Sequence, residues 1–248
     1  MTDPQGTIQT TGRRGPARLV DAALDRAVTL PSGAIHGHVA QLRRRHPHAT
    51  PAELIALLEK EYLLVVQGSG GAVGAAAAAP AVGTGLAMTL TAADVGSFFA
   101  ASAAFSLAVA SVHGIEVQDA GRRRALLLAT ILGESGSEAV VEAGAMAGLR
   151  GLRVGQALLT RMPTGTIARV NNRLTRRLLR RQLAKQSGLA VGRLVPFGIG
   201  AVIGIAGARG LGRTVIDGAR EAFGPAPLTH PEPVRVVETG GEPRLITG

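Results

Sequence analysis

The stretch Gly68-Ser-Gly-Gly-Ala-Val-Gly-Ala-Ala-Ala-Ala-Ala-Pro80 lies within a long run of residues that carry no charge. No Lys, Arg, Asp or Glu occurs from Tyr62 to Ala93, and after Asp94 the uncharged run resumes from Val95 to Ile115. A stretch of this length without charge is buried, either inside a protein or in lipid. How this stretch packs therefore decides the fold.

A strong helix start precedes the glycines. Thr50-Pro-Ala-Glu53 combines an N-cap residue, a proline at the first helical position and the glutamate of a capping box. Leucines follow at helical spacing, and the predicted helix continues through Val66. The glycines at 68–74 therefore continue or follow a helix, not a strand.

The glycines imitate a dinucleotide-binding loop, but their spacing differs from it. Gly68, Gly70 and Gly74 form G-x-G-x-x-x-G, whereas the phosphate-binding fingerprint is G-x-G-x-x-G directly after a strand. Asp94 lies about twenty residues further on, where a ribose-binding acid is expected. No Walker motif occurs in the chain. We therefore interpret the three glycines as a helix-packing face.

A matching pattern near the other end of the chain supplies a packing partner. Gly198, Gly200 and Gly204 repeat the G-x-G-x-x-x-G spacing, and small residues four apart allow two helices to approach closely. Composition favours this kind of packing, because the 248 residues include 34 Gly while aromatic residues make up only 2%. We predict that the two glycine faces contact each other.

Helical periodicity extends over most of the chain. Besides the helix that starts at Thr50, the predicted helices are 16–30, 32–45, 84–112, 118–132 and 137–149. The sequence thus predicts an all-α fold, a Gly/Ala-rich packed helical bundle in a single domain at 16–224. Residues 1–15 and 225–248 are expected to be disordered tails. Val95 to Ile115 has the length of a membrane span, but its Ala, Gly and Ser content equally suits a buried helix.

The charge of the chain points to an anionic partner. The formal net charge is +10, and no acidic residue occurs between Glu142 and Asp217. Within this region arginines recur at spacings of three and four beside an apolar stripe, at Arg169, Arg173, Arg176, Arg177, Arg180 and Arg181. A basic amphipathic helix suits an anionic membrane surface. A solvated helix face is the simpler alternative, and nucleic acid is disfavoured because no aromatic residue lies among these arginines.

Candidates for catalysis or metal binding are few. Glu138 and Glu142 share a helical face and could form a carboxylate pair, although solvated charges are far commoner. Four histidines lie near the N-terminus: His36, His38, His46 and His48. To bind a metal ion they would need a third ligand close by, and the arginines at 43–45 would repel the cation. The chain has no cysteine and no G-x-S-x-G elbow. We expect no catalytic residue, no metal site and no cofactor.

Several segments resemble the EcsC protein family. The C-terminal ones are Leu194–Gly204, Ala208–Ile216 and Ala219–Gly224, and the N-terminal ones are His48–Leu54, Gly68–Gly85 and His113–Val117. The resemblance covers about residues 48–224. It departs from the family at Ala208, where Asn is frequent, and at His113, where an aromatic such as Tyr is expected. It implies a bacterial, helical, membrane-linked protein related to one encoded beside an ABC transporter, and it transfers no catalytic residues.

Three functions follow as hypotheses. The first is a non-enzymatic protein at the cell membrane, integral or peripheral on the cytoplasmic side, accessory to a transporter or to lipid handling. It would be held by the apolar hairpin from Gly68 to Ile115, with the arginine helix on anionic lipid. The second is a soluble, cytoplasmic helical enzyme or lipid-binding protein whose apolar run surrounds a pocket. The third, weaker one is a basic nucleic-acid-binding protein.

Overall fold

The computed structural model describes residues 16–77, 84–146, 148, 153–186, 199–232, 234–239 and 242–247. The helices are α1 (Pro16–Val28), α2 (Ser32–Arg45), α3 (Pro51–Ala77), α4 (Thr84–Val112), α5 (Ala120–Leu132), α6 (Glu134–Met146), the short α7 (Val154–Gln156) with a π-helical turn η1 (Ala157–Arg161), α8 (Thr164–Gln186) and α9 (Ile199–Phe223). The strands are β1 (Ile115–Val117), β2 (Val234–Thr239) and β3 (Glu242–Thr247). The predicted helical bundle is confirmed.

The helix start at Thr50 has the predicted geometry. The Thr50 backbone N–H donates to Oε2 of Glu53 at 2.7 Å, and the Glu53 N–H donates to Oγ1 of Thr50 at 3.3 Å. These reciprocal bonds satisfy amide groups that a helix N-terminus otherwise leaves without partners. The Thr50 N–H and the Thr50 hydroxyl, which both donate to Oε2 of Glu53, lower the pKa of this carboxyl because they favour its charged form.

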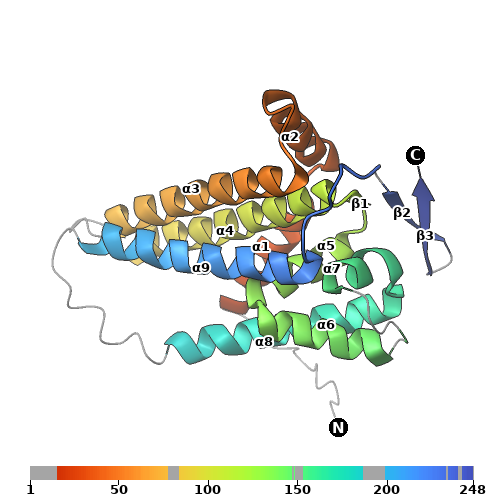
Figure 1. Ribbon diagram of the computed structural model, residues 1–248. Coiled ribbons are helices and arrows are strands. Elements are labelled where there is room, and N and C mark those ends of the chain that lie inside the picture. The colour runs from red at the N-terminus through yellow and green to blue at the C-terminus, as the bar shows by residue number, and fades with distance from the viewer. Residues whose placement is uncertain are drawn as a thin grey trace, which may run out of the picture.

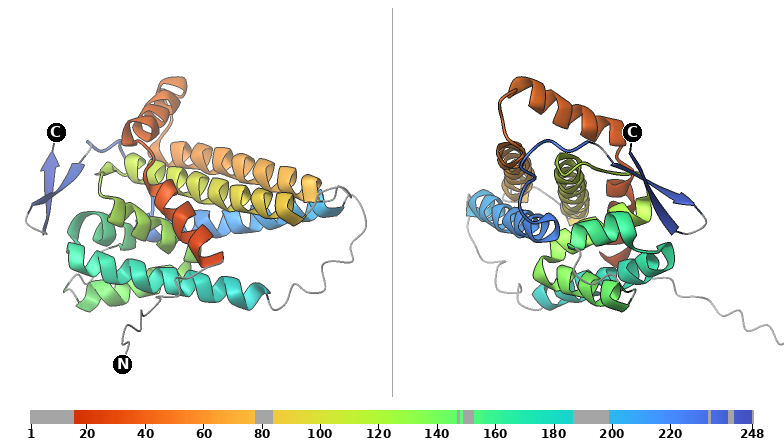
Figure 2. Two further views of the ribbon diagram at one scale, coloured as in Figure 1. Left: turned by 180° about the vertical axis from the view of Figure 1, so that it is seen from behind. Right: turned by 45° about the vertical axis from the view of Figure 1, so that its right-hand side comes forward.

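Three long helices form one layer of the bundle. α3, α4 and α9 run side by side, α2 projects beyond them, and α6 and α8 lie on the opposite side (Figure 1). The left view of Figure 2, taken from behind, shows α1 crossing in front of α4, on the side that faces away from the viewer in Figure 1. α5 lies between the layers, where it contacts α1, α4, α6, α8 and α9. The core is therefore centred on α5 and the second half of α4.

Two adjacent arginines are buried at the start of α5. Arg122 is completely buried, and its guanidinium donates to the carbonyl oxygens of Leu158 and Met162, each at 2.8 Å. Arg123 donates to the carbonyl oxygen of Val117 at 2.8 Å and to that of Leu30 at 2.6 Å. Both residues fall within the predicted helix 118–132, and their side chains connect η1, β1 and the α1–α2 turn to α5.

Their neighbour Arg124 is placed differently. Its guanidinium pairs with Asp21 of α1 at 2.8 Å and also with Asp25. The side chain stays partly exposed, so the pair fastens α1 to α5 at the surface. The three consecutive arginines thus serve three separate contacts.

Glycine permits the closest approach of α9 to α5. A Cβ atom on Gly218 would lie 2.4 Å from the carbonyl oxygen of Thr130, a distance that real Cβ atoms do not reach. Gly210, two turns earlier in α9, is exposed and has nothing within 4 Å of the corresponding position. Only one of these two glycines is required by packing.

A small sheet at one end of the molecule was not predicted. β1 pairs in parallel with β2, matching Ile115 to Val234 and Val117 to Val236, and β2 pairs antiparallel with β3. The segment 225–248, expected to be a disordered tail, therefore contains two strands (Figure 1). Its Pro, Gly and Glu content suggested disorder, but the β-branched residues before Gly240-Gly241 (Val234, Val236 and Val237) and after it (Ile246 and Thr247) are a hairpin signal. Residues 1–15 lie outside the described residues.

The chain turns at His113-Gly114, between the predicted helices 84–112 and 118–132, and this turn has a steric cause. Gly114 has a φ of 75°, and a Cβ there would lie 2.7 Å from Cγ of Pro231. Left-handed backbone and close approach both favour glycine. The turn lets α4 lead into β1 beneath the segment that precedes β2.

Replacing Arg122 by methionine should destabilise the protein. The variant R122M leaves the carbonyl groups of Leu158 and Met162 buried without these donors, at a cost of about 3 kcal/mol. Urea unfolding followed by circular dichroism measures the change. The control R44Q alters an exposed arginine of α2 and should stay within about 0.5 kcal/mol of the parent. An unchanged midpoint for R122M would contradict the structural role.

Two glycine-to-alanine variants of α9 should shift stability in opposite directions. G218A forces α9 away from the Thr130 carbonyl and should cost about 2 kcal/mol or more. G210A gains helix propensity without a clash and should add about 0.5–1 kcal/mol. Thermal unfolding of both variants checks the pair. A rise in the melting temperature of G218A would contradict the close approach of α5 and α9, because it would show that there is room for a Cβ atom at residue 218.

Candidate functional site

The arginine helix buries its apolar stripe inside the protein. Ile167, Val170, Leu174 and Leu178 of α8 are all buried, and α8 packs against α5 and α6. Asn171 adds a hydrogen bond from its side-chain amide to the Gly121 carbonyl oxygen at 2.9 Å. The apolar side of this helix is therefore occupied by protein and is not exposed for insertion into lipid.

The predicted arginines lie on the outer side of α8. Arg177 is half-buried, and the other five are exposed: Arg169, Arg173, Arg176, Arg180 and Arg181. A shallow hollow of about 550 Å³ runs along this side and is lined by Arg169, Asn172, Arg173, Arg176, Arg177 and Arg180. We call the six predicted arginines the arginine face; they are Arg169, Arg173, Arg176, Arg177, Arg180 and Arg181. The structure brings them to one surface, as their spacing predicts.

Only part of the arginine face is paired. Arg173 forms an ion pair with Glu142 of α6 at 2.7 Å, and Arg177 donates to the Ser135 carbonyl oxygen. Among the described residues, Arg176, Arg180 and Arg181 form no ion pair. Guanidinium groups in this situation can bind phosphate or carboxylate through two parallel hydrogen bonds. The face is thus chemically suited to anions.

The predicted glycine face is placed only in part. Gly68 is exposed, and a Cβ on it would meet nothing within 4 Å, while Gly70 is buried. For Gly74, Gly200 and Gly204 the structure describes only helical backbone, and Gly198 lies outside the described residues.

Two other glycines make close contacts between α3 and α9 in the part of these helices that the structure describes. A Cβ on Gly71 would lie 2.9 Å from Cγ1 of Ile205, and one on Gly212 would lie 2.9 Å from Cδ2 of Leu63. The two helices lie side by side in both figures (Figures 1 and 2). Spacing alone missed Gly71 and Gly212, because a motif does not fix which glycines face the neighbouring helix.

The carboxylate and histidine candidates do not converge. Glu138 and Glu142 are both exposed. His36 Nδ1 lies 2.9 Å from Oγ of Ser111, and His38 Nε2 lies 2.8 Å from Oε2 of Glu61, so each histidine has its own partner. Within the described ranges, no three side chains of the metal-binding types come together.

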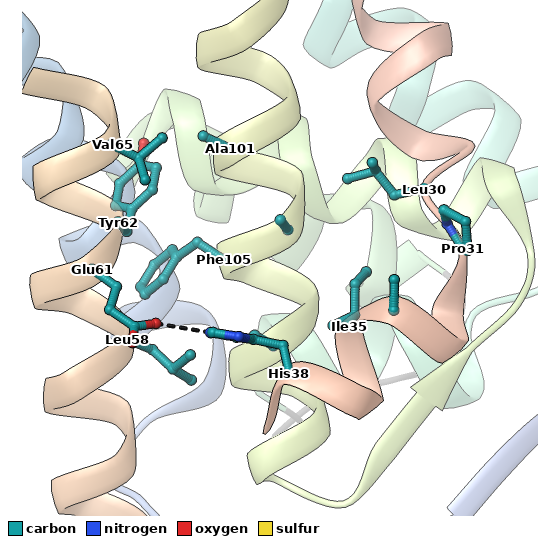
Figure 3. A pocket seen from close by; sticks show the side chains of 13 residues that line it. Leu30, Pro31, Ile35, His38, Leu58, Glu61, Tyr62, Val65, Ala101 and Phe105 are labelled. Carbon is teal, nitrogen blue, oxygen red and sulfur yellow. Dashed lines mark hydrogen bonds and ion pairs between the residues drawn. The ribbon is translucent and has the colours of Figure 1, made fainter. Parts of the chain in front are cut away.

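An apolar pocket lies between α2, α3 and α4 (Figure 3). Its volume is about 380 Å³. Its lining is apolar apart from His38 and Glu61, whose side chains meet at one end of the pocket. Tyr62 stacks on Phe105 with ring centroids 4.7 Å apart, and its hydroxyl forms a 2.8 Å hydrogen bond with Ser102. Burial raises the pKa of Tyr62 to about 12, so this phenol stays protonated.

One stretch of the described chain has the length and apolar character of a membrane span. It is Val95–Val112 in α4, and 56% of it is buried inside the protein. The core helix of a water-soluble bundle has the same length and composition. Length and hydropathy alone therefore do not make α4 a membrane helix.

No family model, curated protein or solved structure matches this chain. The resemblance to the EcsC family stays a prediction.

His113, at the end of α4, is a titratable group held in an apolar environment. Its ring stacks on Phe223 with centroids 5.2 Å apart, and its Nε2 atom has no hydrogen-bond partner within the described structure. Burial lowers the pKa of His113 below its ordinary value of 6.5. Folding thus favours the neutral form of the His113 ring over the protonated form.

Acidification should destabilise the protein through His113. Below pH 6.5 the unfolded chain binds this proton more readily than the folded one, so the stability due to the neutral ring is lost as the pH falls through the folded pKa. H113F keeps an aromatic ring against Phe223 but cannot titrate. Its unfolding free energy should fall less than that of the parent between pH 7.5 and 5.5, whereas the exposed-site control H48Q should follow the parent. Parallel curves for H113F and the parent would exclude this effect.

Proposed function

We propose that this protein is a non-enzymatic helical protein that associates with anionic lipid surfaces through the arginine face of α8. The observation that carries the proposal is that α8 buries its apolar stripe and exposes guanidinium groups on its outer side. Those of Arg176 and Arg180 form no ion pair with any residue that the structure describes. Each basic residue near an anionic membrane contributes about 1 kcal/mol. Several acting together bind a surface without inserting into it.

The proposed association is peripheral. The apolar side of α8 contacts α5 and α6, and more than half of the apolar stretch of α4 is buried in the bundle. These observations favour a protein that lies on the membrane over one that spans it. Attraction between exposed charges is screened by salt, so the binding should be strongest at low ionic strength.

The cytoplasmic side of a bacterial cell membrane is the proposed location. Anionic lipids there attract polybasic surfaces, and the net charge of +10 suits such a partner. The EcsC-like motifs support a role as an accessory to a membrane transporter or to lipid handling. The proposal includes no catalytic step.

Neutralising the arginine face should abolish most lipid binding. The variant R169Q/R176Q/R180Q leaves the Arg173 to Glu142 ion pair and the Arg177 contact intact, so the packing of α8 on α6 is preserved. Sedimentation with phosphatidylcholine vesicles containing phosphatidylserine should show a loss of about 100-fold in affinity, at about 1 kcal/mol for each of three charges. Binding of the parent should also fall steeply as salt is added.

The matched control is R44Q/R45Q, which removes two exposed charges from α2, on the other side of the bundle (Figure 1). Its affinity should remain within about twofold of the parent, because α2 does not face the lipid in this orientation. Equal binding of the parent to vesicles with and without phosphatidylserine would overturn the proposal. Tighter, salt-dependent binding to a duplex oligonucleotide would replace lipid with nucleic acid as the partner.

A further inference from the structure

We propose that the pocket between α2, α3 and α4 binds a single acyl chain. This inference goes beyond lipid-surface binding, because the pocket and the arginine face belong to different helices. None of the residues that line the pocket lies on α8. The two sites can therefore be tested independently.

The shape of the pocket suits a linear apolar chain. Its lining residues recur along two turns of α3, from Leu58 to Val65, and along two turns of α4, from Ala101 to Ala108. Seven residues of helix span about 10 Å. Alanines on α4 leave room between the helices, and α2 closes one side. A volume of about 380 Å³ is within the range of small-molecule pockets.

The chemistry of the lining selects an occupant without polar groups. The Tyr62 hydroxyl, a polar atom close to the pocket, is already bonded to Ser102, and the stacked Tyr62 and Phe105 rings form an apolar wall (Figure 3). A peptide segment would bury N–H and C=O groups that need hydrogen-bond partners, and the lining supplies none of these for it. Hydrocarbon has no such requirement.

The rim of the pocket suits the polar end of the same molecule. His38 and Glu61 come from different helices and meet at 2.8 Å, with about half of each side chain exposed. These two side chains bond to each other at the rim, so each polar group already has a partner there (Figure 3). Val65, which also lines the pocket, is 58% exposed and leaves an apolar opening beside them. The chain would thus lie inside, with its head group in water.

The inference is tested with soluble ligands and no vesicles. Displacement of 11-(dansylamino)undecanoic acid from the full chain by palmitic acid, and by uncharged 1-dodecanol, measures occupation of the pocket. Both should displace the probe, because the apolar chain and not the head group is recognised. The variant R169Q/R176Q/R180Q should bind the probe like the parent, which separates this site from the arginine face.

Filling the pocket should block the ligand without unfolding the protein. A101L/A104L places two larger apolar side chains in the pocket, on successive turns of α4, and leucine retains helix propensity. Excluding two or more methylenes of the chain should weaken binding about tenfold or more. The control A206L makes one such change at an exposed position of α9 and should bind within about twofold of the parent.

Three results would overturn the inference. They are no saturable displacement from the parent, parental affinity for A101L/A104L with unchanged helicity and melting temperature, and displacement by a rigid sterol in place of the flexible chains. Displacement by palmitic acid but not by 1-dodecanol would also count against it, because that outcome assigns the binding to the carboxylate.

Discussion

The fold depends on the burial of two adjacent arginines, Arg122 and Arg123, at the start of the central helix α5. Removing a guanidinium from water is costly unless its N–H groups find acceptors. Main-chain carbonyl groups of η1, β1 and the α1–α2 turn supply those acceptors. Segments that are far apart in the sequence are thereby held around α5, against which α8 also packs.

The same arrangement determines what α8 can do. A basic amphipathic helix in isolation binds membranes with both its charges and its apolar side. In this protein the apolar side is committed to α5 and α6, so only the charges remain for a partner. This division explains why we infer surface association, which salt can reverse, and not insertion.

Small side chains have two consequences in this bundle. Where a glycine meets backbone, as at Gly218, helices come into close contact. Where alanines line the gap between helices, as at Ala101 and Ala104, a pocket remains. A chain with so few aromatic residues has little bulk with which to fill such a gap, and the Tyr62 to Phe105 stack forms only one wall of it.

Local chemistry could be predicted from the sequence alone. The capping box at Thr50, the end of the helix predicted at 84–112 and the arginine spacing on α8 depend on neighbouring residues, and the corresponding elements occur as predicted. The sequence could not show that Arg122 is buried while Arg124 is partly exposed, that Gly71 and not Gly68 meets α9, or that β1 pairs with β2. Each of these depends on contacts between distant segments, and the free energy of burying a charge or closing a gap is set by what the tertiary structure places opposite it.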